Sequence, residues 1–137
     1  MKHPLGIIGP LFFFLSVLCG CDLGDALKPE PLLDASVNGT SVTYALTQSF
    51  SLELDLNADA GYQWFYSASD TTVIHVDGTE YRPKSGNWNQ VGGLTVETFH
   101  FRATKPGRCS ISLYERRGWL PNVAPIDSVR FGVVVIQ

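Results

Sequence analysis

The sequence predicts an all-β fold, an immunoglobulin-like β-sandwich of seven to eight strands. Two observations carry this prediction. Apolar and polar residues alternate over several short segments, as in strands with one buried face. Turn-forming Gly, Pro and Asn residues separate these segments. No segment has a convincing helical period, and the Cys…Trp…Cys spacing of antibody domains is absent, so the expected similarity to immunoglobulins is architectural.

The clearest strand covers residues 50–56, where Phe50, Leu52, Leu54 and Leu56 are apolar and the residues between them are polar. A long connection rich in Gly, Pro and Asn is expected over 77–93. The expected strands cover residues 41–45, 50–56, 62–67, 72–76, 94–103, 109–115 and 128–137, with a further short strand near 80–82.

The N-terminus is typical of an export signal. Lys2 precedes an apolar run over 5–18, which is shorter than the roughly 20 residues of a membrane span. The run ends in Leu-Cys-Gly-Cys at 18–21, which resembles a bacterial lipobox and implies cleavage before Cys21 and lipid on its thiol. The alternatives are an ordinary secretory signal or an uncleaved anchor. We expect a protein of the bacterial cell envelope, periplasmic or surface-exposed, that is attached to the membrane through lipid on Cys21.

The expected organisation is a signal peptide (1–20), a tether (21–40) and one folded domain (41–137). The 137 residues include 10 basic and 13 acidic side chains, with a net charge of −3 and no basic cluster, so nucleic-acid binding is not expected. Cys109 is the one cysteine beyond Cys21, which excludes a disulfide within the domain and indicates a thiol in the core. No cofactor or metal ion is expected.

Three predicted loops stand out. The first, at 57–62, has a small tip and Gly61, and aromatic residues follow it; the simplest interpretation is a turn. The second, at 89–94, contains two adjacent glycines that permit close approach of a partner. The third, at 116–121, contains Trp119 beside arginine, and both residue types are enriched in binding hot spots. The alternative for Trp119 is a lid over one end of the sandwich.

These loops and their order resemble the chagasin family of cysteine-protease inhibitors, from about residue 42 to 136. The first family motif, Asn-Pro-Thr-Thr-Gly-Phe/Tyr followed by Trp, corresponds to Asn-Ala-Asp-Ala-Gly-Tyr at 57–62 with Trp64. The second, Gly-x-Gly-Gly, corresponds to Gln-Val-Gly-Gly at 90–93. The third, Arg-Pro-Trp, corresponds to Arg-Gly-Trp at 117–119.

The resemblance implies a monomeric inhibitor without catalytic residues, whose three loops block the active-site cleft of a papain-like cysteine protease. The first loop would cover the catalytic cysteine, and the other two would flank it. The protease-binding residues that it implies are Asn57, Ala58, Asp59, Ala60, Gly61, Tyr62, Trp64, Gly92, Gly93, Leu94, Arg117, Gly118 and Trp119.

The sequence departs from the family pattern at the loop tips. Asp59 and Ala60 replace the two threonines, and Ala58 and Gly118 replace prolines. A second hypothesis is therefore a cell-envelope binding module that has lost inhibition and binds another protein or a glycan. An enzyme is a third hypothesis, but no catalytic or metal-ligand spacing supports it.

Overall fold

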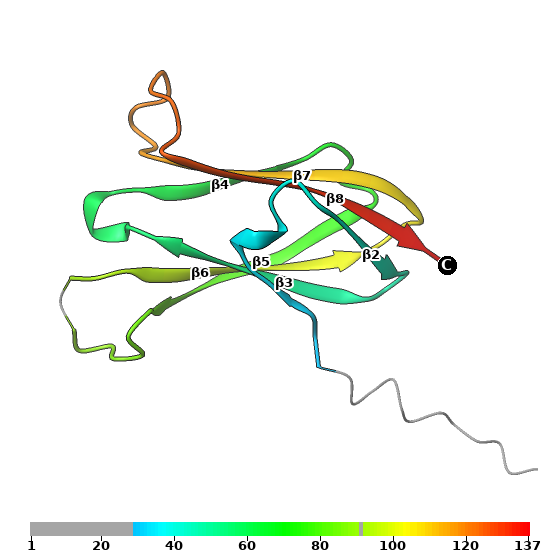
Figure 1. Ribbon diagram of the computed structural model, residues 1–137, viewed down its shortest axis with the longest axis horizontal. Helices are drawn as coiled ribbons and strands as arrows, with labels where there is room; N and C mark the ends of the chain where they lie inside the picture. Colours follow the sequence, from blue (N-terminus) through cyan, green and yellow to red (C-terminus); the bar gives the residue numbers. More distant parts are fainter. Residues whose placement is uncertain (1–28, 91) are drawn as a thin grey trace, which may run out of the picture.

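The computed structural model describes residues 29–90 and 92–137, which form a two-layer β-sandwich (Figure 1). The expected signal peptide, Cys21 and the first part of the tether lie outside the described residues. Within the described ranges, the helical segments are the two short 3₁₀ turns η2 (Ala35–Val37) and η3 (Ala58–Ala60). Neither of these described helices has the length and apolar character needed to cross a membrane.

The eight strands form two four-stranded sheets, which confirms the predicted all-β sandwich. The first sheet has the order β1-β3-β6-β5, with bounds Leu32–Leu33, Ser49–Leu56, Thr95–Ala103 and Ile74–Pro83. The second has the order β2-β8-β7-β4, with bounds Ser41–Ala45, Asp127–Ile136, Gly107–Arg116 and Gln63–Ala68.

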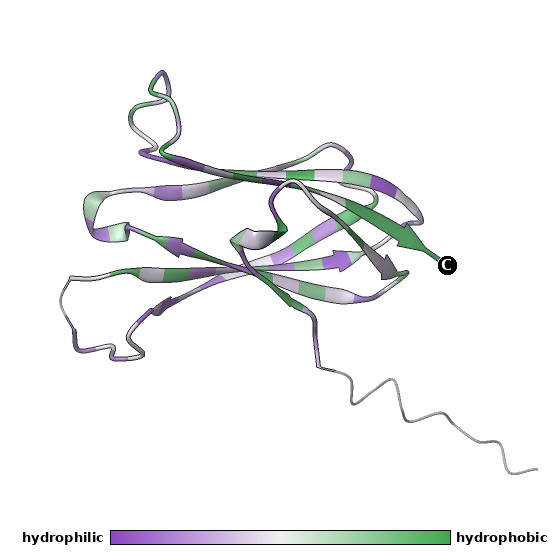
Figure 2. Cartoon of the chain, in the orientation of Figure 1, coloured by the Kyte–Doolittle hydropathy of each residue, from purple (hydrophilic) through white to green (hydrophobic). Residues whose placement is uncertain are grey.

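The core lies between the sheets and follows from the alternating pattern. Antiparallel pairing of β3 with β6 places Phe50 opposite Phe101 and Leu52 opposite Phe99, and all four side chains are buried. Phe50 stacks between Tyr44 and Phe101, with ring centroids 4.2 and 5.1 Å apart. Figure 2 shows the corresponding alternation of hydrophobic and hydrophilic residues along the strands.

The structure corrects the expected break after residue 76. β5 is one strand from Ile74 to Pro83, and it pairs with β6 on both sides of Asp77. Asp77 lies in a bulge, because the register with β6 shifts between Val76 and Gly78. The Asp77 carboxylate accepts a hydrogen bond from Arg102 of β6, so the bulge is tied to the neighbouring strand. Residues 77–83, expected to belong to a long connection, therefore continue the strand beyond a bulge.

The domain also begins earlier than residue 41. Leu32 and Leu33 of β1 pair in parallel with Ser51 and Leu52 of β3. After β1, the η2 turn places the Val37 side chain in the core, where it is 6% exposed. Residues 32–40 thus belong to the folded domain and not to a tether.

Candidate functional site

Three loops meet at one end of the sandwich (Figure 1). The first loop (57–62) joins β3 to β4, the second loop (84–94, of which residue 91 is not described) joins β5 to β6, and the third loop (117–126) joins β7 to β8. The β2–β3 turn and the C-terminus lie at the other end. The three segments that the sequence singled out are thus neighbours in space.

The first loop is a tight, small-residue turn. The amide of Ala60 donates to the carbonyl of Asn57 (3.2 Å), and that of Gly61 donates to the carbonyl of Ala58 (2.8 Å). Gly61 closes the turn with φ of 78°, in the left-handed region where a side chain is strained. Ala58 and Asp59 are exposed at the tip. The tip is therefore narrow and held by its own backbone.

Two buried groups fix the base of the first loop. Trp64 donates its indole N–H to the carbonyl of Asp55 (2.9 Å), which joins β4 to the end of β3. Glu115 on β7 accepts a hydrogen bond from the amide of Asn57 (3.3 Å). Trp64 is 7% exposed, so it supports the loop from the core and does not belong to the binding surface in which the sequence analysis placed it.

The third loop holds the first. Arg117 donates from Nε to the carbonyl of Ala60 (3.0 Å), and its guanidinium lies 4.7 Å from the centre of the Tyr62 ring. Trp119 rests on Gly61, since a Cβ added to this glycine would lie 2.2 Å from the ring atom Cη2. The remainder of the Trp119 side chain faces solvent, and the residue is 65% exposed. The first loop thus supports an indole that is presented outward.

Gly118 lies between these two residues and close to side chains of β4. A Cβ at Gly118 would lie 3.3 Å from the side-chain oxygen of Gln63 and 3.4 Å from the Phe65 ring. The guanidinium of Arg116 lies over the Phe65 ring, 4.7 Å from its centre. The start of the third loop is therefore packed along β4.

The second loop approaches the first from the other side. Its ends are joined by a hydrogen bond from the amide of Lys84 to the carbonyl of Leu94 (2.9 Å). The Lys84 ammonium pairs with Asp55 at the end of β3. Gly92 has φ of 79°, and a Cβ added to it would lie 3.7 Å from the Asp59 carboxylate. Gly93 (φ 120°) and the exposed Leu94 complete the loop, which lies next to the tip of the first loop.

One exposed aromatic residue at this end was missed. Trp88 in the second loop is 73% exposed, more than Trp119. The sequence signal was the same in both cases, a tryptophan within a short polar and glycine-containing segment.

Two carboxyl groups face the interior beneath the loops. Glu97 and Glu115 continue the inward-facing positions of β6 and β7, and both are buried. Burial raises the pKa of the Glu97 carboxyl, which accepts a hydrogen bond from the hydroxyl of Tyr81 (2.9 Å). Burial also raises the pKa of the Glu115 carboxyl, against the opposing effect of the Asn57 amide. Glu115 is the one that touches a loop, so its contribution to the site is to position Asn57.

A serine and a histidine lie together on the outer face of the first sheet, away from the loops. Ser51 Oγ is 2.8 Å from Nδ1 of His100, a spacing found in nucleophilic sites. The Ser51 hydroxyl also donates to Glu30, and Ser51 is buried. A substrate has no access to this hydroxyl, which instead attaches the N-terminal segment to β3.

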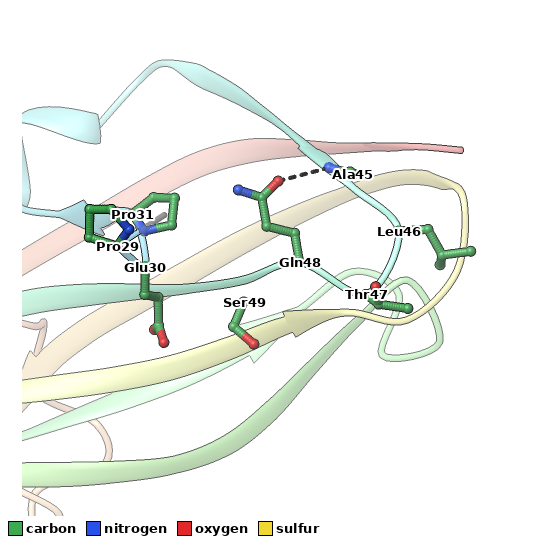
Figure 3. A pocket seen from close by; sticks show the side chains of 8 residues that line it. All are labelled: Pro29, Glu30, Pro31, Ala45, Leu46, Thr47, Gln48 and Ser49. Carbon is green, nitrogen blue, oxygen red and sulfur yellow. Dashed lines mark hydrogen bonds between the residues drawn. The ribbon is translucent and has the colours of Figure 1, made fainter. Parts of the chain in front are cut away.

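A hollow of about 450 Å³ lies at the end opposite the loops (Figure 3). The side chain of Gln48 accepts a hydrogen bond from the amide of Ala45 (3.0 Å) and closes the β2–β3 turn beside it. The lining residues are Pro29, Glu30, Pro31, Ala45, Leu46, Thr47, Gln48 and Ser49. The hollow marks where the N-terminal segment meets the sandwich and holds a single ionisable side chain, Glu30.

The contact between Gly61 and Trp119 can be tested against a matched glycine. Gly39 has nearly the same backbone angle (φ 76°), but a Cβ added there would meet nothing within 4 Å. Gly61→Ala and Gly39→Ala should each lower the free energy of unfolding by about 1–2 kcal/mol, because both place a side chain in the left-handed region. In protein labelled with 5-fluorotryptophan, Gly61→Ala alone should shift the ¹⁹F resonance of Trp119. An unchanged Trp119 resonance in Gly61→Ala would contradict the packing described here.

Comparison with known proteins agrees with this arrangement. The family described as "Chagasin family peptidase inhibitor I42" matches residues 43–133, more than half of the chain. A comparison with curated proteins finds no match.

Three solved structures share the fold. The cysteine protease inhibitor EhICP2 of Entamoeba histolytica is 18% identical, with a TM-score of 0.69 over 77% of this chain and 95% of that chain. Amebosin is 24% identical, with a TM-score of 0.66 over 80% of this chain and 100% of that chain. PbICP-C, solved in complex with falcipain-2, is 14% identical, with a TM-score of 0.56 over 77% of this chain and 99% of that chain. The chain belongs to the chagasin family of peptidase inhibitors, whose members inhibit proteases and are not enzymes.

Proposed function

We propose that this protein is a monomeric inhibitor of papain-like cysteine proteases that blocks the active-site cleft with its three loops. One observation carries the proposal. The narrow first loop is held by Arg117 and Trp119 of the third loop, and Gly92 of the second loop lies near Asp59 on its other side (Figure 1). Such an arrangement gives a wedge with a thin centre and apolar flanks.

The backbone conformation of the first loop explains why a protease would bind the wedge without cleaving it. The tip at 58–60 is a 3₁₀ turn, so its peptide bonds do not lie in an extended strand. Contacts within the loop and to the third loop order the tip before binding. Little conformational entropy is then lost on association, and a modest contact area gives tight binding.

The comparisons support the class of target. PbICP-C, one of the structural neighbours, is seen in complex with falcipain-2, and EhICP2 is named a cysteine protease inhibitor. Family membership rests on the match over 43–133, which includes all three loops.

Contacts between the loops compensate for the two prolines that this chain lacks. Ala58 and Gly118 stand where the family has proline, and proline would stiffen each loop on its own. Here the Arg117–Ala60 hydrogen bond and the Trp119–Gly61 packing restrict the first and third loops together. The two loops are therefore made rigid by contacts between them and not by a proline within each loop.

The second candidate is a cell-envelope module that binds another protein or a glycan. The observation that favours it is Asp59, an exposed carboxylate at the tip where the family has threonine. In an inhibitor this carboxylate would enter the cleft beside the catalytic thiolate and imidazolium. Restoring threonine at 59 and 60 should strengthen inhibition only if the chain uses the family's binding mode.

The proposed anchor is compatible with this use of the loops. β1 is parallel to β3, and β3 leads into the first loop, so the chain before Leu32 comes from the opposite end. Pro29 and Pro31 lie beside the β2–β3 turn at that end (Figure 3). A domain attached to the bacterial envelope through lipid on Cys21 would therefore present its loops away from the membrane.

Inhibition is tested by titrating papain and a cathepsin-L-like protease with the domain from residue 29 onward, using a small fluorogenic substrate. We expect tight inhibition, and we expect Trp119→Ala to weaken it by about 30-fold or more, the loss typical of a truncated hot-spot residue. Leu46→Ala, in the β2–β3 turn at the other end, is the control and should leave inhibition unchanged. No inhibition of either enzyme at micromolar concentrations of the folded domain would refute the proposal.

Lipid attachment is tested by expressing the full chain in a bacterium grown with labelled palmitate. The wild-type chain and Cys19→Ser should carry the label and sediment with membranes, since the cleavage that the lipobox implies removes Cys19. Cys21→Ser should lose both properties. Label retained in Cys21→Ser, or absent from the wild type, would rule out the proposed anchor.

A further inference from the structure

Trp88 is the most exposed of the large hydrophobic side chains in the described chain, at 73%. Single exposed apolar residues are common on protein surfaces and need no explanation by themselves. Two further features set Trp88 apart. The turn around it is ordered by hydrogen bonds, and the second loop, which carries it, lies at the same end of the sandwich as the third loop (Figure 1).

The turn holds Trp88 at the surface. The side-chain oxygen of Asn87 accepts a hydrogen bond from the amide of Asn89 (3.0 Å), and the carbonyl of Asn87 accepts one from the amide of Gln90 (3.2 Å). Asn87 thus bonds both residues that follow Trp88, as in an Asx-turn. The chain is ordered although the indole remains in water, which reduces the entropy that a partner must remove on binding.

The loops that carry the two exposed tryptophans lie on opposite sides of the first loop (Figure 1). Trp119 rests on Gly61 from the third loop, and Gly92 of the second loop faces Asp59. Figure 1 shows the first loop between the other two at this end of the sandwich. The narrow tip is therefore flanked by one tryptophan-bearing loop on each side.

We propose that Trp88 is a second apolar anchor, which packs on the rim of the protease cleft opposite the rim that Trp119 contacts. The inference rests on the proposed function and adds a specificity-determining residue to it. The partner is the same protease, because Trp88 lies on a loop that flanks the first loop. When the first loop enters the cleft, one rim of the cleft comes close to each flanking loop. An apolar or aromatic rim surface is the chemistry that an indole would recognise.

The experiment compares Trp88→Ala, Trp88→Phe and the double variant with Trp119→Ala, against papain and a cathepsin-L-like protease. Trp88→Ala should weaken inhibition by about 10-fold or more, and Trp88→Phe should restore most of the loss. The two tryptophans lie on different loops, so their losses should multiply in the double variant. Ile136→Ala, an exposed residue of β8 at the other end, is the matched control and should have no effect.

Two readouts separate the possible failures. Urea unfolding of Trp88→Ala should match the wild type, because the side chain is in solvent. In protein labelled with 5-fluorotryptophan, the ¹⁹F resonance of Trp88 should shift when protease is added. A wild-type domain that inhibits, with Trp88→Ala within twofold of it and no ¹⁹F shift, would overturn this inference alone. A wild-type domain that inhibits neither enzyme would overturn the proposed function together with it.

Discussion

The packing of Trp119 on Gly61 is the contact on which the rest of the site depends. Glycine is required at this position twice, once for the left-handed backbone that closes the turn and once for the space that the indole occupies. The Arg117 hydrogen bond to Ala60 reinforces the same junction. Two loops that are far apart in the sequence thereby act as one surface, and the first loop has an exposed aromatic ring at its side.

The sandwich serves this surface as a rigid frame. The stacked rings of Tyr44, Phe50 and Phe101 fill its centre. At the loop end, two buried side chains bond to the backbone beside the first loop. The Trp64 indole donates to the carbonyl of Asp55, and the Glu115 carboxylate accepts from the amide of Asn57. Burying Glu115 has a cost, as its raised pKa indicates, and the hydrogen bond to the Asn57 amide offsets part of it. The proposed wedge needs such a frame, because loops that moved in the free protein would lose conformational entropy on binding.

Most of the fold could be predicted because several strands, most clearly β3, alternate between apolar and polar residues. β5 could not be delimited, since the Gly, Pro and Asn residues of 77–93 indicated a connection and only the pairing with β6 shows that the strand continues to Pro83. β1 was missed because two residues carry no periodicity, and its position depends on β3. Local sequence patterns therefore predict strands that have one buried face. They do not predict β1 or the full length of β5, because these depend on pairing with a neighbouring strand.

The site was predictable in its location and less so in its details. The glycines and Trp119 were found because their residue types are costly or unusual in a loop. Trp64 was placed on the binding surface because a motif does not say which ring faces the core; its position in phase with the inward side of β4 is what buries it. The Arg117–Ala60 hydrogen bond and the packing of Trp119 on Gly61 join separate loops, so no local pattern encodes them.

Hydrogen–deuterium exchange of the domain with excess papain tests the central claim most directly, since it reports every backbone segment that the enzyme covers. The account predicts slower exchange in all three loops, at 57–62, 84–94 and 117–126. The β2–β3 turn, beside the hollow at the other end, should exchange as it does in the free protein. Protection centred on that turn or on the outer sheet face, with the loops unchanged, would contradict the account.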